Sequence, residues 1–351
     1  MLHRGRKWLI VLIPVISGII LAILVLSDSC KKDEDITLPL VGTVSISDVG
    51  ETTFKGITSI GYDGGAHVME RGLCWSTNPN PTILDDRTSD GEGAGTFHSD
   101  IMDLTPSTLY HVRSYATNSE GTGYGDFVNV HTWTGTVNDI DNNSYHTIVI
   151  GSQEWMGENL RVKQLNNGIK MLPLDPVDTL HNTVPGYWYY DTPEGGTYSY
   201  DKDVYGPIYN GYAVLTDKLC PQGWHIPSSD DWQTLVDYLG GYKVAGGKMK
   251  EAGTTHWQSP NNRATNESGF KAIPGGCYNH SLGFGGCGGG EGSHFSGLGD
   301  KGLWWSSTQN IKDFRSDLVL YVAVLLYDST GVYPGNGFQK DGRSVRCIKN
   351  Q

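Results

Sequence analysis

The stretch "KLCPQGWHIPSSDDWQTLVDYLGG", residues 218–241, carries the clearest helix signal in the chain. Ser228 or Ser229 can cap this helix, because a serine hydroxyl accepts a hydrogen bond from a free N–H of the first turn. The carboxylates of Asp230 and Asp231 suit the positive end of the helix, and Gly240 is a typical residue just past its last turn. The predicted buried face is an apolar stripe at helical spacing: Trp232, Leu235, Val236 and Leu239.

Strand-like and loop-rich sequence surrounds this helix. Residues 137–162 contain two strand-like runs around an Asp/Asn turn. A short second helix is predicted in "KVAGGKMKEAG", residues 243–253, and two final strands in "LVLYVAVLLYD", residues 318–328, and "GRSVRCIKN", residues 342–350. We therefore expect residues 136–351 to form one domain in which a single long helix lies among strands.

Six separated blocks of this domain carry a resemblance to a known family. In chain order they are "DIDNNSYHTIVIGSQEWMGENLRV", "YGPIYNGYAV", "LCPQGWHIPSSDDWQTLVDYLGG", "ATNESGFKAIPGG", "LWWSST" and "GRSVRCIK". Together they resemble the Fibrobacter succinogenes major paralogous domain family. Two of them also resemble the formylglycine-generating-enzyme branch of the C-type-lectin-like fold. The resemblance implies an α+β, C-type-lectin-like domain with twisted antiparallel sheets and long loops.

Residues 38–134 show a different pattern, with short β-rich runs separated by turn signals such as "DGG" and "NPNP". This pattern is typical of an all-β sandwich of about seven strands. The segments "ERGLCWSTNPNPT" and "LTPSTLYHVRSYATNSEGTGYG" are similar to the fibronectin type III consensus. The resemblance implies that Tyr110 is the tyrosine-corner residue and that the domain is a spacer or a docking module. Cys74 is expected to be a buried, unpaired thiol.

The N-terminus has the layout of an export signal: basic residues, an apolar stretch over residues 8–26, and small residues before Cys30. Nineteen apolar residues are also nearly enough to span a bilayer, which needs about 20. "LSDSC" followed by "KKDED" resembles the lipobox and acidic tether of bacterial, Bacteroidota-type lipoproteins. We therefore expect a signal peptide over residues 1–29, lipidation of Cys30, a tether over residues 30–37, and a lipid-anchored protein of the outer membrane, exposed at the cell surface.

The charge of the chain argues against nucleic acid as a partner. Its formal net charge is -12, and removing residues 1–29, which hold three of the positive charges and one of the negative ones, makes it -14. An acidic surface repels phosphate backbones. The expected partners are instead the membrane, through the lipid anchor, and a glycan or surface protein as a ligand.

Four further cysteines lie in the second domain. The resemblance to the C-type-lectin-like fold implies a disulfide between Cys220, before the main helix, and Cys347, in the last strand. Cys277 and Cys287 flank a glycine-rich segment, for which three alternatives stay open. They form a local disulfide, they bind Zn²⁺ together with His280 and His294, or they are free thiols. The disulfide is favoured, and no metal or other cofactor is expected.

The function predicted from the sequence is non-catalytic binding or adhesion, with glycans as the ligand class. No nucleophile elbow, P-loop or zinc-protease motif occurs. Flat aromatic faces suit sugar rings, and the candidate ligand-binding residues are Tyr187, Trp188, Tyr189, Tyr190 and Trp257, whereas Trp224, Trp304 and Trp305 are expected in the core. Two alternatives remain. One is an accessory subunit of an outer-membrane assembly, and the other is an oxidase resembling the formylglycine-generating enzymes, which bind copper through a cysteine pair.

Overall fold

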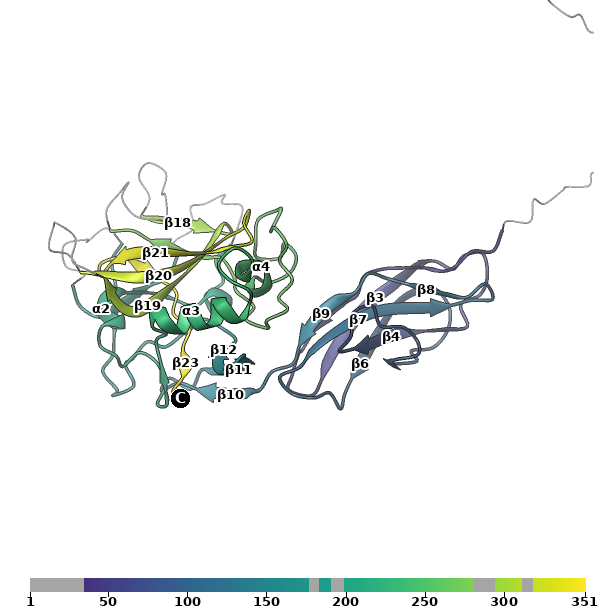
Figure 1. Ribbon diagram of the computed structural model, residues 1–351, viewed down its shortest axis with the longest axis horizontal. Helices are drawn as coiled ribbons and strands as arrows, with labels where there is room; N and C mark the ends of the chain where they lie inside the picture. Colours follow the sequence, from purple (N-terminus) through teal and green to yellow (C-terminus); the bar gives the residue numbers. More distant parts are fainter. Residues whose placement is uncertain (1–34, 177–182, 191–198, 281–293, 311–317) are drawn as a thin grey trace, which may run out of the picture. The chain divides into compact units, whose positions relative to one another are not determined.

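The computed structural model describes residues 35–176, 183–190, 199–280, 294–310 and 318–351 (Figure 1). Residues 1–34, and with them the apolar stretch and Cys30, lie outside this range. Within the described residues, no helix is both long enough and apolar enough to cross a bilayer.

Residues 40–131 form two antiparallel sheets. In the first sheet the strand order is β1-β3-β2, and β6 also pairs with β3. Its strands are β1 (Leu40–Val41), β2 (Ser45–Ser47), β3 (Phe54–Tyr62) and β6 (Gly95–Ile101). The second has the order β5-β4-β7-β8, with β9 also paired to β7; these are β4 (Glu70–Ser76), β5 (Asp86–Arg87), β7 (Leu109–Thr117), β8 (Thr122–Tyr124) and β9 (Val128–His131). Both sheets contribute to one apolar cluster, which includes Phe54, Phe97, Leu73 and Val112. This is the all-β sandwich that the sequence predicts.

Two predictions for the sandwich are confirmed. The hydroxyl of Tyr110 accepts a hydrogen bond from the backbone N–H of Thr105 at 3.0 Å, which is the bond of a tyrosine corner. Cys74 is fully buried and unpaired. Burial raises the pKa of its thiol to about 11, so this thiol stays protonated at neutral pH.

The described residues of the second domain form three sheets. The first has the order β10-β11-β12-β23-β16, and its strands are β10 (Gly135–Asn138), β11 (Ser144–Ile150), β12 (Gln153–Met156), β23 (Ile348–Lys349) and β16 (Trp224–His225). In this sheet β23, near the end of the chain, pairs with β12, near the start of the domain. The second has the order β13-β14-β15-β22-β17-β18: β13 (Leu172–Pro173), β14 (Gly186–Trp188), β15 (Ile208–Asn210), β22 (Gly342–Arg343), β17 (Gly275–Tyr278) and β18 (Phe295–Leu298). The third is the antiparallel sheet β19-β20-β21: β19 (Lys301–Asn310), β20 (Val319–Leu326) and β21 (Val332–Phe338).

The helices of this domain are short. They are α1 (Lys202–Tyr205), α2 (Gly211–Val214), α3 (Ser229–Tyr238) and α4 (Ala245–Met249), where α4 lies in the predicted second helix. Both described domains therefore consist mostly of strands, and the α+β, C-type-lectin-like class implied for residues 136–351 stays a prediction. The longest helix, α3, contacts β19 (Figure 1).

Helix α3 forms where the sequence predicts it. Ser228, and not Ser229, is the cap: its hydroxyl accepts from the N–H of Asp231 at 3.1 Å, and the Asp231 carboxylate accepts from the N–H of Ser228 at 2.8 Å. This reciprocal pair satisfies two N–H groups that a helix start leaves free. Gly240, at φ 101°, follows the last turn in the left-handed region that favours glycine.

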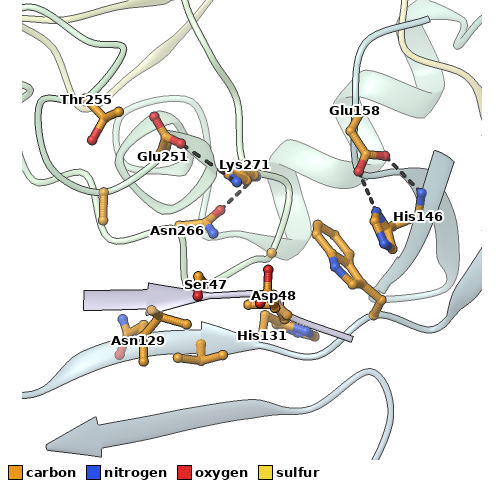
Figure 2. A pocket seen from close by; sticks show the side chains of 16 residues that line it. Ser47, Asp48, Asn129, His131, His146, Glu158, Glu251, Thr255, Asn266 and Lys271 are labelled. Atoms are coloured by element: carbon orange, nitrogen blue, oxygen red, sulfur yellow. Dashed lines mark hydrogen bonds and ion pairs between the residues drawn. The ribbon is translucent and has the colours of Figure 1, made fainter. Parts of the chain in front are cut away.

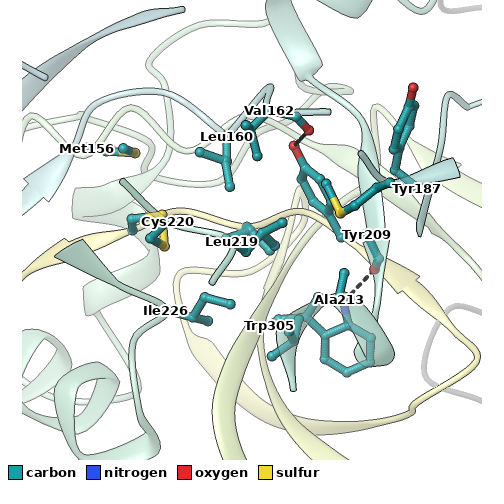
Figure 3. Packing of buried hydrophobic residues seen from close by; sticks show 14 of the residues in the cluster. Met156, Leu160, Val162, Tyr187, Tyr209, Ala213, Leu219, Cys220, Ile226 and Trp305 are labelled. Atoms are coloured by element: carbon teal, nitrogen blue, oxygen red, sulfur yellow. Dashed lines mark hydrogen bonds between the residues drawn. A yellow bond between two sulfur atoms is a disulfide. The ribbon is translucent and has the colours of Figure 1, made fainter. Parts of the chain in front are cut away.

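Among the described residues of the second domain, the two largest of four apolar clusters make up most of the core. One surrounds Tyr209, whose hydroxyl donates to the carbonyl of Val162 at 2.8 Å and whose own carbonyl accepts from the indole N–H of Trp305 at 2.7 Å (Figure 3). The other contains the buried side chains of α3 together with Trp155, Trp257 and Trp304. Trp304 and Trp305 are fully buried, as predicted, and Trp224 is partly buried.

Candidate functional site

Trp257, one of the predicted ligand-binding residues, lies in the core. Its side chain is 0% exposed, and its indole N–H donates to the carbonyl of Ala272 at 2.8 Å. The ammonium of Lys250 lies 5.4 Å from the centre of its ring. A ligand cannot reach this ring in the observed conformation, and the assignment of Trp257 to a binding surface is corrected.

The predicted aromatic run at residues 187–190 is also largely enclosed. Tyr187 and Trp188 are buried, and Trp188 stacks on Tyr278 with ring centres 4.1 Å apart. Tyr189 and Tyr190 are half-buried, and they pack against other aromatic rings as well. Aromatic side chains carry large apolar areas that are stabilised by burial, and in this segment burial, rather than display, accounts for them.

A groove of about 240 Å³ lies between α3 and the third sheet. Its lining comes from α3, from Tyr242 just after the helix, and from β19, β20 and β21. The lining residues are Ser229, Asp230, Trp232, Gln233, Val236, Tyr242, Ser306, Tyr321, Val322, Ala323, Val332, Tyr333 and Pro334. Three tyrosines and one tryptophan therefore line a single cavity together with polar side chains.

Trp232 anchors the helix side of the groove. Its side chain is 5% exposed, and its ring packs against Trp155 at 5.0 Å and Phe270 at 5.9 Å between ring centres. Its indole N–H has no hydrogen-bond partner among the described residues. A buried N–H without a partner costs about 1–3 kcal/mol. A ligand acceptor that bonded to this N–H would recover that free energy.

Two of the tyrosines are held by their hydroxyls. Tyr242 donates to the Oε1 of Gln233 at 2.6 Å, and the hydroxyls of Tyr333 and Ser329 lie 2.7 Å apart. The two residues are nevertheless 39% and 45% exposed, for Tyr242 and Tyr333 respectively. The pKa of Tyr242 is raised by burial and by the nearby Asp237 carboxylate, so its hydroxyl remains a donor. The ring orientations are therefore set in advance of any ligand.

The start of α3 supplies the groove with an exposed carboxylate. Asp231 is occupied by the cap and by the ring Nε2 of His225 at 3.3 Å. Burial alone would raise the pKa of the Asp231 carboxyl, but the hydrogen bonds from Ser228 and His225 outweigh burial and lower it. Asp230, in contrast, is exposed and lines the groove.

A second pocket contains several charged groups that are already paired (Figure 2). The Oε1 of Glu158 lies 2.6 Å from the Nδ1 of His146, and the Oε2 of Glu158 accepts from the backbone N–H of His146 at 2.9 Å. The hydrogen bond to Glu158 raises the pKa of His146 despite its burial. Glu251 is shared by His256, at 2.6 Å, and Lys271, at 3.9 Å. A ligand here would have to break these pairs, so the groove beside α3 is the better candidate.

The cysteines are partly accounted for by the structure. Cys220 and Cys347 form a disulfide with an S–S distance of 2.02 Å, as the resemblance implied. Cys277 is disulfide-bonded as well, whereas Cys287 lies outside the described residues. Within the described ranges, no group of three or more His, Cys, Asp or Glu side chains could hold a metal ion. The Nδ1 of His280 lies 2.8 Å from the Oδ1 of Asp341, and the Nδ1 of His294 lies 2.7 Å from the carbonyl oxygen of Asn279.

Sequence reasoning missed the groove because its aromatic residues are far apart in the chain. Tyr242, Tyr321 and Tyr333 come together only through the pairing of β20 with β21 and the packing of the helix nearby. A usable signal exists for the last two. Each is a tyrosine within a strand of otherwise apolar or turn-forming residues, and in the structure Tyr321 is half-buried and Tyr333 is exposed.

Comparison with solved structures returns matches to about a quarter of the chain. Domains of titin match with 17% identity and a TM-score of 0.22, covering 27% of this chain and 32% of the titin chain. The sixth fibronectin type III domain of human fibronectin type III domain containing protein 3 matches with 20% identity and a TM-score of 0.22, covering 27% of this chain and 87% of that domain's chain. With TM-scores this low, these similarities carry no argument about function. No curated protein matches the chain.

A family model, in contrast, matches the greater part of the chain. The model described as the Fibrobacter succinogenes major domain matches residues 148–349, which include α3, the groove and the Cys220–Cys347 disulfide. This range lies within the second domain predicted from the sequence. The chain therefore belongs to the Fibrobacter succinogenes major domain family.

Proposed function

We propose that the chain is a non-catalytic binding module of the cell surface, anchored by lipid at Cys30, and that the groove beside α3 binds a glycan. The observation that carries this proposal is the pair of tyrosines, Tyr242 and Tyr333. Their hydroxyls are tied to Gln233 and Ser329, while their rings stay exposed at the groove. Rings fixed in advance lose little conformational entropy on binding.

The chemistry of the groove matches that of a sugar. The rings of Tyr242 and Tyr333 and the exposed Pro334 suit the C–H faces of a sugar ring, and the side chains of Asp230 and Tyr321 offer partners for hydroxyls. The groove, at about 240 Å³, is smaller than the roughly 300–1,000 Å³ typical of drug-sized ligands. It therefore suits one ring of a longer chain rather than a whole oligosaccharide.

The test is glycan-array binding by the purified residues 36–351, followed by calorimetry with the best ligand. Tyr242→Ala and Tyr333→Ala are each expected to weaken binding by about 5- to 150-fold, which corresponds to ~1–3 kcal/mol of lost stacking and burial. Tyr238→Ala is the matched control. Tyr238 is the last residue of α3 and is 65% exposed, but it does not line the groove. Absence of any glycan signal, or equal losses in all three variants, would overturn the glycan proposal.

The lipid anchor has its own test. Cells fed a clickable fatty acid should label the wild-type protein, and Cys30→Ala should abolish the label, because a thioether-linked lipid needs the cysteine sulfur. Several acyl chains are needed for stable attachment, since each buried CH₂ contributes about 0.8 kcal/mol. Equal labelling of both proteins would refute lipidation at Cys30.

A further inference from the structure

We propose that the ligand of the groove is an amino sugar, bound through a positively charged amine on the ring. This inference rests on the proposed function and narrows it to one class of glycan. It follows from the charges, the helix start and the aromatic rings that surround the groove.

The groove has a single formal charge among its described lining residues, the carboxylate of Asp230. Asp230 is exposed, and its carboxylate forms no hydrogen bond or ion pair with another described residue. The neighbouring Asp231 is different, because Ser228 and His225 already occupy its carboxylate. Asp230 is therefore available to pair with a charge brought by the ligand.

The start of α3 does not favour an anion, although helix N-termini commonly do. The N–H of Ser229 donates to the hydroxyl of Thr308 at 2.9 Å, and the N–H of Asp231 donates to the Ser228 hydroxyl at 3.1 Å. Two carboxylates, Asp230 and Asp231, also neutralise the positive end of the helix dipole. A uronic acid entering here would find occupied N–H groups and an unpaired negative charge.

The aromatic lining favours a cation independently of Asp230. A ring face attracts an ammonium group within about 6 Å of its centre. Tyr242 and Tyr333 are held by their hydroxyls, remain 39% and 45% exposed, and both line the groove. One carboxylate and several fixed rings around a small cavity form a suitable environment for one ammonium group attached to one sugar ring.

The experiment compares three oligosaccharides of equal length by calorimetry: glucosamine, N-acetylglucosamine and galacturonic acid oligomers. A slightly acidic, low-salt buffer keeps the free amines charged. The glucosamine oligomer is expected to bind about five-fold more tightly than its acetylated form, which corresponds to about 1 kcal/mol for one charge pair in water. The galacturonic acid oligomer is expected to bind most weakly of the three.

The variant Asp230→Asn should remove the preference for the free amine, so that the free and acetylated oligomers bind equally. Asp203→Asn is the control, because Asp203 is an exposed carboxylate in the first turn of α1 that does not line the groove. About 1 M salt, where the Debye length is about 3 Å, should also remove the preference in the wild type.

The outcomes separate this inference from the proposed function. Equal binding of the free and acetylated oligomers, tighter binding of the galacturonic acid oligomer, or a preference that survives in Asp230→Asn would each overturn the amino-sugar inference and leave glycan binding standing. If no oligosaccharide binds the wild type and the array also gives no signal, the proposed function fails, and the inference fails with it.

Discussion

Arg346 donates from its Nη2 to the Oδ1 of Asn159 at 3.1 Å, across 187 residues of sequence. Both side chains are buried, and the same Oδ1 accepts the indole N–H of Trp304 at 2.8 Å. The guanidinium lies 4.3 Å from the ring centre of Phe270, whose carbonyl it also contacts. Burial lowers the pKa of Arg346 to about 9, and the charge of Glu158 offsets part of this effect. One amide oxygen thus links three distant parts of the domain.

Asn159→Leu is expected to destabilise the protein by about 3–5 kcal/mol, because it removes the acceptor from a buried charge and from the Trp304 N–H. The measurement is urea unfolding followed by tryptophan fluorescence. Asn167→Leu, at an exposed position, is the control and should change stability by only about 0.5 kcal/mol. Similar losses of stability in the two variants would contradict the prediction that the hydrogen bonds of Asn159 stabilise the folded protein.

The Cys220–Cys347 disulfide closes a loop with a sequence separation of 127. In the chain-entropy model, a loop of about 100 residues corresponds to about 4.7 kcal/mol of stabilisation. The double variant Cys220→Ala/Cys347→Ala should therefore lose several kcal/mol in denaturant unfolding. A reducing agent should destabilise the wild type more than the variant, because the variant lacks this disulfide and keeps only that of Cys277. A variant as stable as the oxidised wild type would contradict this prediction.

Lys250 is fully buried, and its ammonium donates to three backbone carbonyls, those of Ser329 at 2.8 Å, Leu326 at 3.1 Å and Tyr327 at 3.3 Å. Burial lowers its pKa to about 8, whereas a lysine in the unfolded chain titrates near 10.4. Between these values the unfolded chain holds the proton more tightly than the folded protein, so the contribution of Lys250 to stability rises with pH and is lost as pH falls through about 8.

Comparing wild type with Lys250→Met isolates this contribution. The wild-type free energy of unfolding, relative to that of the variant, should increase from about pH 8 to about pH 10. At neutral pH the variant loses a hydrogen bond to each of the three carbonyls but also loses a buried charge. A pH-independent difference between the two proteins would contradict the lowered pKa.

The sequence predicts those features that depend on local pattern. Helix α3, its stripe of apolar residues and its two candidate caps follow from spacing and residue type within 24 letters. The sandwich follows from strand and turn signals, and the Cys220–Cys347 pairing from family resemblance. None of these requires knowledge of which distant segments meet.

The aromatic site could not be predicted in the same way. The run at residues 187–190 looks like a display of rings, yet Trp188 stacks on Tyr278, which is 90 positions later in the chain. Tyr321 and Tyr333 lie in different strands, and the register of β20 with β21 decides whether they share a cavity with the helix. Burial and display of an aromatic residue are set by such long-range pairings, and composition does not reveal them.

Ser228 and Ser229 were equivalent candidates for the cap of α3, and the structure distinguishes them. Ser228→Ala should cost about 1 kcal/mol, within the range of about 0.5–2 kcal/mol for a lost serine cap, because the N–H of Asp231 loses its acceptor. Ser229→Ala should cost much less, since it is the backbone N–H of Ser229, and not its hydroxyl, that bonds to Thr308. Thermal unfolding of both variants measures the difference. An equal loss of stability in the two variants would contradict the assigned cap. Because Asp230 and Gln233 line the groove from the first turns of this helix, Ser228→Ala should also weaken ligand binding in the groove.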